Sequence, residues 1–288
     1  MKRIIRVTTA FFVFTILLSC STFKVAAIAL RCAENFSFLV LGVDDTWLNT
    51  DTIMLVNVDS SDETIKVLSI PRDTMVCYDG RNCKINSVFA KCISRGMSEK
   101  DSAETFKSFI DHAIGTSVSF AVILDANAFV SIVDAAHGVE ITIEDDLNIE
   151  MACGEFLSLK SGVNKLSGSE ALYFVRHRKN YKDADLGRIG AQSAFVRGFL
   201  KKLSKLDSLS VMNVYKTALD TVVIDASPHT FSSIDSIIRS LKYRDVSFYV
   251  LPGEAVILNN VSYYKINRSE ADRILSVFGG MCSPKAII

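Results

Sequence analysis

Apolar and polar positions alternate along the chain in blocks that have the lengths of strands and helices. Three apolar stretches, Phe36–Val43, Ile53–Val58 and Thr64–Ile70, are short, rich in β-branched residues and separated by polar segments. Each therefore predicts a strand. Because these stretches are almost continuously apolar, we expect a sheet that is covered on both faces.

The pattern after these strands alternates between the helical and the strand period. Helices are predicted over 101–113, 126–136, about Asp185–Leu203, 211–219, 228–241 and 269–278, and strands at "SFAVILD" (Ser119–Asp125), "VEITI" and "VSFYVL". Ser167 and Glu170 have the spacing of a capping box, which marks another helix start. Strands alternating with helices predict an α/β sandwich, and no linker divides residues 36–288, so we expect one domain there.

The first 35 residues differ in character from this domain and predict a membrane segment with a short linker. Lys2, Arg3 and Arg6 precede Val7–Phe23, which contains no charge and is at the short end of the roughly 17–25 residues that cross a bilayer. Basic residues before the segment favour a cytoplasmic tip and an extracytoplasmic domain, as in a single-pass protein of the cell membrane. A signal anchor, a cleaved signal and a lipoprotein modified at Cys20 of "LLSC" all fit this pattern.

Composition narrows the classes of function. Lysine plus arginine and aspartate plus glutamate both total 32, so the net charge is zero. No overall basic field marks the chain as a nucleic-acid binder, and any anion site must be local. The seven cysteines form no CxxC motif, so a thiolate metal site is not expected. Cys77 and Cys83 flank a predicted turn and are either disulfide-bonded or free thiols.

Two aspartates lie where predicted strands end and begin. Asp44 follows the first strand and Asp51 precedes the second, so both carboxylates are expected at one edge of the sheet. Magnesium is commonly held by one or two carboxylates together with phosphate oxygens and water. Aspartates at strand ends also form turns, and this simpler interpretation stays open at this stage.

A charged pair follows the third strand in "SIPRDT". Arg72 and Asp73 come directly after Pro71, and "KIN" supplies Lys84 a short distance later. In open α/β sheets, ligands bind beyond the carboxyl ends of parallel strands, where Arg72 is expected to lie. An anion contact and a surface ion pair both explain these residues.

The segment "YFVRHRKNYKDADLGRIGAQ" carries the largest group of cations. We expect Arg176 and Arg178, two residues apart, to point to the same side of an extended segment. Asp185, Arg188 and Gln192 have the spacing of one helix face. Guanidinium groups that converge need an anion, and their planar forks match phosphate oxygens, so a phosphate or pyrophosphate site is predicted. A solvated basic face is the alternative.

Seven motifs occur in an order that resembles one known family. They are "LGVD", "TDTIMLV", "SIPRDT", "KIN", "VDAAHGVEI", "LSGSEALYFVRHR" and "DLGRIGAQ". Together they resemble the LytR-CpsA-Psr family of bacterial cell-envelope proteins over about Phe36–Leu203. The resemblance implies a three-layer α-β-α sandwich with a central mixed sheet.

The resemblance also implies an activity and a set of site residues. The implied enzyme is a membrane-anchored, magnesium-dependent phosphotransferase that moves a teichoic acid-like or capsule-like glycopolymer from a polyprenyl-pyrophosphate carrier to peptidoglycan. Magnesium would be held by Asp44 and Asp51, the pyrophosphate would be bound by Arg72, Lys84, Arg176, Arg178, Arg188 and Gln192, and catalysis would involve Arg72, Asp73, Asp185 and Arg188. Which aspartate acts as the general base stays open.

Some positions depart from the pattern of this family. The chain has Asp45 and Asn49–Thr50 in a shortened loop that commonly carries arginines, Ala191 where an arginine is usual, and His137 where a glycine is usual. Three alternative functions therefore stay open. They are hydrolysis of the polyprenyl pyrophosphate, non-catalytic binding in the envelope, and the regulatory role of relatives labelled transcriptional attenuators.

Overall fold

A six-stranded mixed sheet forms the centre of the structure. The computed structural model describes residues 36–44, 46–59, 64–151, 154–177, 184–224, 246–283 and 286–288, without the side chains of 184–189. The strand order is β11-β6-β1-β2-β3-β12. These strands are β1 (Phe36–Val43), β2 (Thr50–Asp59), β3 (Thr64–Ser69), β6 (Val118–Leu124), β11 (Val223–Ile224) and β12 (Val246–Val250).

The strand directions give the sheet two distinct ends. β1 is parallel to β6 and β3 is parallel to β12, whereas β2 is antiparallel to both of its neighbours. The carboxyl ends of β1, β3, β6 and β12 therefore meet the start of β2 at one end, where Val43 pairs with Thr50. We call this the Val43 end. The opposite end, where Phe36 pairs with Val58, is the Phe36 end.

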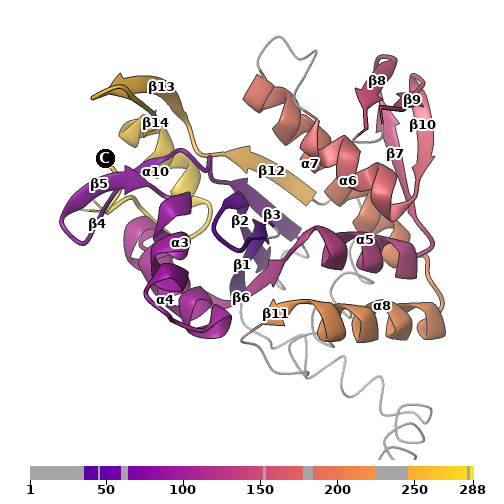
Figure 1. The fold of residues 1–288 in the computed structure, drawn as a ribbon, viewed down its shortest axis with the longest axis horizontal. Coiled ribbons are helices and arrows are strands. Elements are labelled where there is room, and N and C mark those ends of the chain that lie inside the picture. The colour runs from indigo at the N-terminus through magenta and orange to yellow at the C-terminus, as the bar shows by residue number, and fades with distance from the viewer. Residues whose placement is uncertain are drawn as a thin grey trace, which may run out of the picture.

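Helices cover both faces of the sheet, as predicted (Figure 1). One side holds α3 (Asn86–Ser94), α4 (Glu99–Ile114) and α10 (Arg268–Ser276). The other side holds α5 (Ala126–Ala135), α6 (Gly168–Arg176), α7 (Ala184–Leu203) and α8 (Ser208–Thr221). The predicted α/β architecture with a central mixed sheet is confirmed.

Most predicted elements are present with shifted ends. β2 begins at Thr50 instead of Ile53, and the helix predicted over 101–113 runs from Glu99 to Ile114. The capping box before α6 is confirmed, because the Ser167 and Glu170 side chains each accept a bond from the other's backbone N–H. The helix predicted over 228–241 lies outside the described residues.

Short strands also pair outside the central sheet, and most of them were not predicted. They pair as hairpins or small two-stranded sheets: β4 (Met75–Tyr78) with β5 (Arg81–Lys84), β7 (Val139–Ile143) with β10 (Gly162–Leu166), β8 (Leu147–Glu150) with β9 (Phe156–Leu159), and β13 (Gly253–Leu258) with β14 (Val261–Ile266). Of these only β7 was expected. Many of these strands are partly polar, so a short apolar run does not reveal them.

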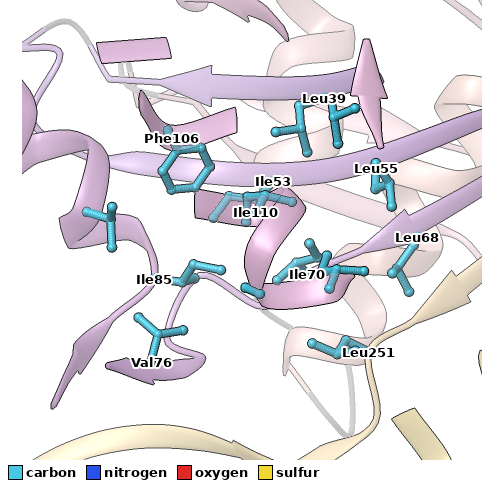
Figure 2. Close-up of a cluster of buried hydrophobic side chains, with 14 of the residues drawn as sticks. Leu39, Ile53, Leu55, Leu68, Ile70, Val76, Ile85, Phe106, Ile110 and Leu251 are labelled. Atoms are coloured by element: carbon cyan, nitrogen blue, oxygen red, sulfur yellow. The ribbon is translucent and has the colours of Figure 1, made fainter. Parts of the chain in front are cut away.

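One face of the central sheet is buried across its centre, although Asn57 and Lys66 nearer the Phe36 end are partly exposed, and we call it the closed face. Leu39 and Leu41 of β1, Leu55 of β2 and Leu68 of β3 have no exposed surface. They pack in one cluster with residues of α3, α4 and α10. Figure 2 shows Leu39, Leu55 and Leu68 with Phe106 and Ile110 of α4. Large apolar side chains enclosed in this way supply most of the favourable free energy of folding.

The opposite face is also apolar but only partly covered, and we call it the open face. Phe36, Phe38 and Val40 alternate with the buried residues of β1 and are partly exposed. The ring of Phe38 stacks on that of Phe120 in β6, with centroids 4.9 Å apart. Val56, Phe248 and Leu200 of α7 belong to the same cluster. Other residues of this face are buried, namely Met54, Val58, Ile65, Val67 and Val246, so the open face is accessible over only part of its area.

A second apolar cluster lies around α5, α6 and α7 and the β7–β10 pair. Gly198 allows α7 to lie close to β7, because a Cβ atom there would be 2.3 Å from the carbonyl oxygen of Glu140. His137 precedes β7 with a φ of 61°, in the left-handed region that glycine favours. This conformation explains why a glycine would be the ordinary residue at position 137.

The chain terminus and the β13–β14 hairpin complete a layer beside β4. Thr74 and Tyr264 form a parallel bridge, and the backbone N–H of Cys77 donates to Ala286 O at 2.9 Å. Ile287 is fully buried in the closed-face cluster. The last residues of the chain are therefore part of the folded core.

The cysteine and membrane predictions have different outcomes. Cys77 and Cys83 are free, and β4–β5 pairing sets Cys77 opposite Asn82 and Cys83 opposite Val76. Since neighbouring residues of a strand point to opposite faces, the two thiols face apart and the disulfide alternative is wrong.

Among the helices that the structure describes, none has the length and apolar character of a membrane span. The predicted segment Val7–Phe23 and Cys20 lie outside the described residues.

Candidate active site

Arg72 lies at the Val43 end of the sheet, as predicted. It follows β3 and Pro71, and its Nη1 atom is paired with Oδ1 of Asp51, at the start of β2. The backbone is fixed there, because Thr74 N donates to Pro71 O at 3.0 Å and Asn86 N donates to Arg72 O at 3.2 Å. Both charged side chains remain partly exposed, so the pair is accessible to a ligand.

Asp73 and Lys84 form a second ion pair beside the first. Lys84 Nζ lies 2.8 Å from Asp73 Oδ1, and Lys84 comes from the end of β5. The backbone N–H of Tyr264 donates to Asp73 O at 2.8 Å, so β14 holds the main chain of Asp73. The β4–β5 hairpin and the β13–β14 hairpin thus jointly position the charged residues of "SIPRDT" and "KIN".

Asp44 organises the loop that leads from β1 to β2. Its Oδ1 accepts from Thr46 Oγ1 at 2.8 Å and from the backbone N–H groups of Thr46, Leu48 and Asn49, and its Oδ2 accepts from Asn49 Nδ2. Desolvation opposes ionisation of this carboxyl, but the hydrogen bonds from Asn49, Thr46 and Leu48 lower its pKa overall. The turn-forming role of Asp44 is therefore confirmed, and its carboxylate stays ionised.

Gln192 reaches this end of the sheet from α7. Its Nε2 atom donates to Thr52 Oγ1 at 3.4 Å, and the Gln192 side chain is buried. Thr52 faces the same side as Met54, Val56 and the other residues of the open face, since β2 alternates. The contact therefore brings α7 to the Val43 end of the open face, one residue along β2 from Asp51.

The arrangement predicted for the arginine-rich segment is wrong at Arg176. This residue is the last of α6 and is exposed, instead of lying in an extended strand-like segment. The chain becomes extended only at His177. The capping box fixes the start of α6. Packing of Ala171 and Phe174 in the second apolar cluster stabilises the helix as far as Arg176. Arg178 lies outside the described residues, so its predicted role is untested.

Asp185 and Arg188 belong to α7, whose backbone runs without interruption from Ala184 to Leu203. The helix predicted for the motif "DLGRIGAQ" is confirmed, whereas the side chains of Asp185 and Arg188 are outside the described set. Ala191 is buried in the second apolar cluster with Phe195. An arginine at position 191 would therefore meet apolar side chains.

Sequence reasoning did not find Thr52, Tyr264 or the open face as parts of this region. Thr52 and Tyr264 act through a hydroxyl and a backbone N–H, and these contacts carry no distinctive pattern in the sequence. The open face had a signal, because β1 and β6 are apolar at successive positions instead of alternating. That signal predicts coverage by helices, not partial exposure.

Asp44 and Asp51 are the two residues that the resemblance assigns to magnesium. In the described part of the chain, no three His, Cys, Asp or Glu side chains gather to hold a metal ion. Asp51 Oδ1 is paired with Arg72, which leaves its second oxygen for another ligand. Each carboxylate oxygen has two lone-pair sites, so Asp44 Oδ2 retains one beyond its bond from Asn49. Each carboxylate therefore keeps an oxygen lone pair of the kind that a magnesium ion takes alongside phosphate and water.

Several known proteins are similar to this chain. It is 22% identical over 253 residues to the polyisoprenyl-teichoic acid–peptidoglycan teichoic acid transferase TagV of Bacillus subtilis, covering 83% of this chain and 62% of TagV. It is 28% identical over 255 residues to the corresponding transferase TagU of Halalkalibacterium halodurans, covering 86% of this chain and 79% of TagU. The chain thus spans less than two thirds of the length of TagV.

The fold matches solved structures as well. The structure of TagT bound to LIIa-WTA superposes with a TM-score of 0.70 at 26% identity, covering 86% of this chain and 90% of that one. The profile of the LytR_cpsA_psr family matches residues 20–277. A match over that much of the sequence confirms the resemblance carried by the seven motifs, and the chain belongs to the LytR_cpsA_psr family.

Proposed function

We propose that this protein is a phosphotransferase that attaches a polyprenyl-pyrophosphate-linked glycopolymer, such as a teichoic acid or capsule polymer, to peptidoglycan. The observation that carries the proposal is the junction at the Val43 end, where Arg72, Lys84 and Gln192 lie at the end of a partly exposed apolar face. The printed names of TagV and TagU, both teichoic acid transferases, support it.

The donor has two parts that need opposite environments, and the sheet offers both. The pyrophosphate needs cations and hydrogen-bond donors, which Arg72, Lys84 and Gln192 provide from three separate elements. Arg176, Arg178 and Arg188 would add to this set. The polyprenyl tail needs apolar surface, and the open face runs from Gly42 and Thr52 along β1 and β2 to Phe36 and Val58.

Magnesium would be held by Asp44 and Asp51, with the remaining ligands supplied by the donor and water. When bound, it would neutralise charge on the transferred phosphoryl group. The protein's own contribution is to hold the ionised carboxylate of Asp44 by the hydrogen bonds of its loop and to place Asp51 next to Arg72.

The transfer forms a bond between a peptidoglycan hydroxyl oxygen and the phosphorus atom that carries the glycopolymer. The bond from that phosphorus to the bridging oxygen breaks, and polyprenyl phosphate leaves. Arg72 stabilises charge on the phosphoryl oxygens in the transition state. Asp73 is positioned by Lys84 and by the backbone of β14. Its carboxylate is the candidate to accept the proton of the attacking hydroxyl. Asp185 and Arg188 are the further catalytic candidates of the family motif.

The location that fits this substrate is the outer side of the cell membrane. Val7–Phe23 would serve as a single-pass anchor, or Cys20 would carry a lipid, and either would leave the domain from Phe36 onward extracytoplasmic. The donor lipid and the peptidoglycan acceptor would both be within reach there.

Substitution of Arg72 tests the proposed site. Arg72→Ala should lower single-turnover transfer roughly ten- to a hundredfold, because a charge-assisted hydrogen bond contributes about 1.5–3 kcal/mol. Arg72→Lys should recover part of the rate, since it keeps the charge but loses the planar fork. The measurement is transfer from a synthetic polyprenyl-pyrophosphate glycan to peptidoglycan oligomers with magnesium present.

The matched control is Arg81→Ala, which removes an exposed arginine from the β4–β5 hairpin and should leave the rate unchanged. Wild-type transfer by Arg72→Ala would show that this cluster is not the active site. Product analysis in the same assay separates transfer from hydrolysis, because hydrolysis would release the polymer instead of joining it to peptidoglycan.

A further inference from the structure

The end of α7 and the start of α8 form a surface that combines cations with exposed apolar side chains. We call it the α7–α8 corner, and it consists of Lys201, Lys202, Lys205, Leu209 and Met212. Leu209 is 81% exposed and Met212 is 56% exposed, although both belong to a well-formed helix. Lys205 is exposed, and Lys201 and Lys202 are partly exposed.

These apolar residues point away from the protein because the opposite side of α8 makes the contacts. Val211 and Val214 are buried, and α8 packs along α5. Figure 1 shows α8 below α5, among the lowest of the described elements. Burial of Leu209 and Met212 therefore requires something outside the described part of the chain.

The corner lies toward the Phe36 end of the sheet. Leu200, directly before the lysines, packs in the cluster that contains Phe36, Val58 and Val246. Gln192, two turns earlier, lies at Thr52 near the opposite end. α7 therefore runs along the open face from the candidate active site to the place where β1 begins.

We propose that the α7–α8 corner binds an anionic bilayer surface, with Leu209 and Met212 entering the interface and the lysines contacting lipid headgroups. Apolar side chains flanked by lysines are the composition of segments that lie on membranes. Each lysine near an anionic surface increases binding about fivefold, and partly buried apolar side chains add to this. Asp207 lies between Lys205 and Leu209 in the chain, and its carboxylate accepts bonds from the N–H groups of Leu209 and Ser210 at the helix start.

A bilayer is favoured over another partner by what else lies at this end of the sheet. The predicted membrane segment Val7–Phe23 is joined by a short linker to Phe36, the first residue of β1. A polyprenyl tail along the open face would leave the protein at the same end. The inference therefore rests on the proposed function, and it adds an orientation in which α7 leads from the membrane to the active site.

The test measures contact between the corner and lipid in the full-length chain, reconstituted in phosphatidylcholine vesicles with or without phosphatidylglycerol. Leu209→Trp introduces a second tryptophan, whose fluorescence reports on the corner. Trp47 is the one tryptophan of the unmodified chain, and the quenching of its fluorescence by the same lipids gives the baseline. Lipids with a quencher high in the acyl chain should quench the new fluorescence when phosphatidylglycerol is present. High salt should weaken this effect, because it screens exposed charges.

Two controls make the result specific. Ile257→Trp places the reporter on the β13–β14 hairpin, which is also highly exposed and apolar, and it should not be quenched above the baseline. Lys202→Glu with Lys205→Glu should reduce the population in contact by more than tenfold, since each lysine contributes about fivefold. Lys100→Glu with Lys265→Glu makes the same change in net charge on exposed residues of α4 and β14 and should have no effect.

The proposal is overturned if Leu209→Trp is quenched no more than Ile257→Trp, or if the chain does not float with the vesicles. The assay contains no donor or acceptor, so its outcome does not depend on transfer activity. Transfer measured in detergent tests the proposed function without a bilayer. Failure of one inference is therefore distinguishable from failure of the other.

Discussion

The closed and open faces of the central sheet have nearly the same apolar character but different surroundings. On the closed face, Leu39, Leu41, Leu55 and Leu68 have no exposed surface and are covered by three helices. On the open face, Phe36, Phe38 and Val40 remain partly exposed, although aromatic stacking and Leu200 cover part of their area.

This difference separates stability from binding. Apolar surface that stays in contact with water contributes less to folding than surface that is removed from it. The exposed part of this surface remains available to an apolar ligand, and the open face ends at Thr52, next along β2 to Asp51 and its partner Arg72. We therefore expect substitutions on the closed face to act on folding, and substitutions on the open face to act mainly on the lipid donor.

The largest effect is expected on the closed face. Leu41→Ala should lower the free energy of unfolding by about 2–5 kcal/mol, because it removes a fully buried side chain and leaves a cavity. Chemical denaturation of the purified protein measures this change. The donor KM of the folded fraction should stay near that of the wild type, and a selective loss of donor binding would contradict the assignment of this face.

The next effect concerns the helix that borders the open face. Gly198→Ala should destabilise the protein by about 1–3 kcal/mol, because the added methyl group meets the carbonyl of Glu140 and pushes α7 away from β7. Thermal unfolding measures the loss. Gly190→Ala is the matched control, since a Cβ atom at Gly190 meets no atom within 4 Å. Equal behaviour of the two variants would show that α7 does not depend on this close approach.

A smaller change in stability, with a specific effect on substrate, is expected on the open face. Phe38→Ala should cost roughly 1–2 kcal/mol of stability, because its side chain is only partly buried. The KM for a long polyprenyl donor should rise about tenfold as apolar contact is lost. A donor with a short prenyl chain supplies the comparison, and an equal rise for both donors would place the tail elsewhere.

The smallest effect is a pH dependence in the layer that covers the closed face. Burial raises the pKa of Asp111 in α4, against the opposing effects of its bond from Val118 N at 2.6 Å and of Lys107. The folded state therefore holds this proton more tightly, and the protein loses stability as pH rises through the raised pKa.

Asp111→Asn keeps the acceptor oxygen and removes the titration. It should be slightly more stable than the wild type at neutral pH, and the difference should disappear below about pH 3, where aspartate is protonated in both states. Urea unfolding at several pH values measures the two curves. A constant difference at all pH values would mean that the effect does not come from ionisation of Asp111.

The sequence by itself determined the elements whose pattern is local. The apolar runs predicted β1, β3 and β6, the capping box predicted the start of α6, and seven ordered motifs identified the family. It also placed Arg72 correctly at a strand end, because Pro71 ends the extended segment and polar residues follow it at once. These features depend on neighbouring residues, so a one-dimensional pattern contains them.

Only the tertiary structure decided which distant residues meet and which surfaces remain open. Arg72 pairs with Asp51 from another strand, Gln192 reaches Thr52 from α7, and the backbone of Tyr264 holds Asp73. Two apolar faces with similar sequences became different because α3, α4 and α10 bury the centre of one of them. Such contacts depend on how separate elements pack in space, and the order of residues along the chain does not contain that information.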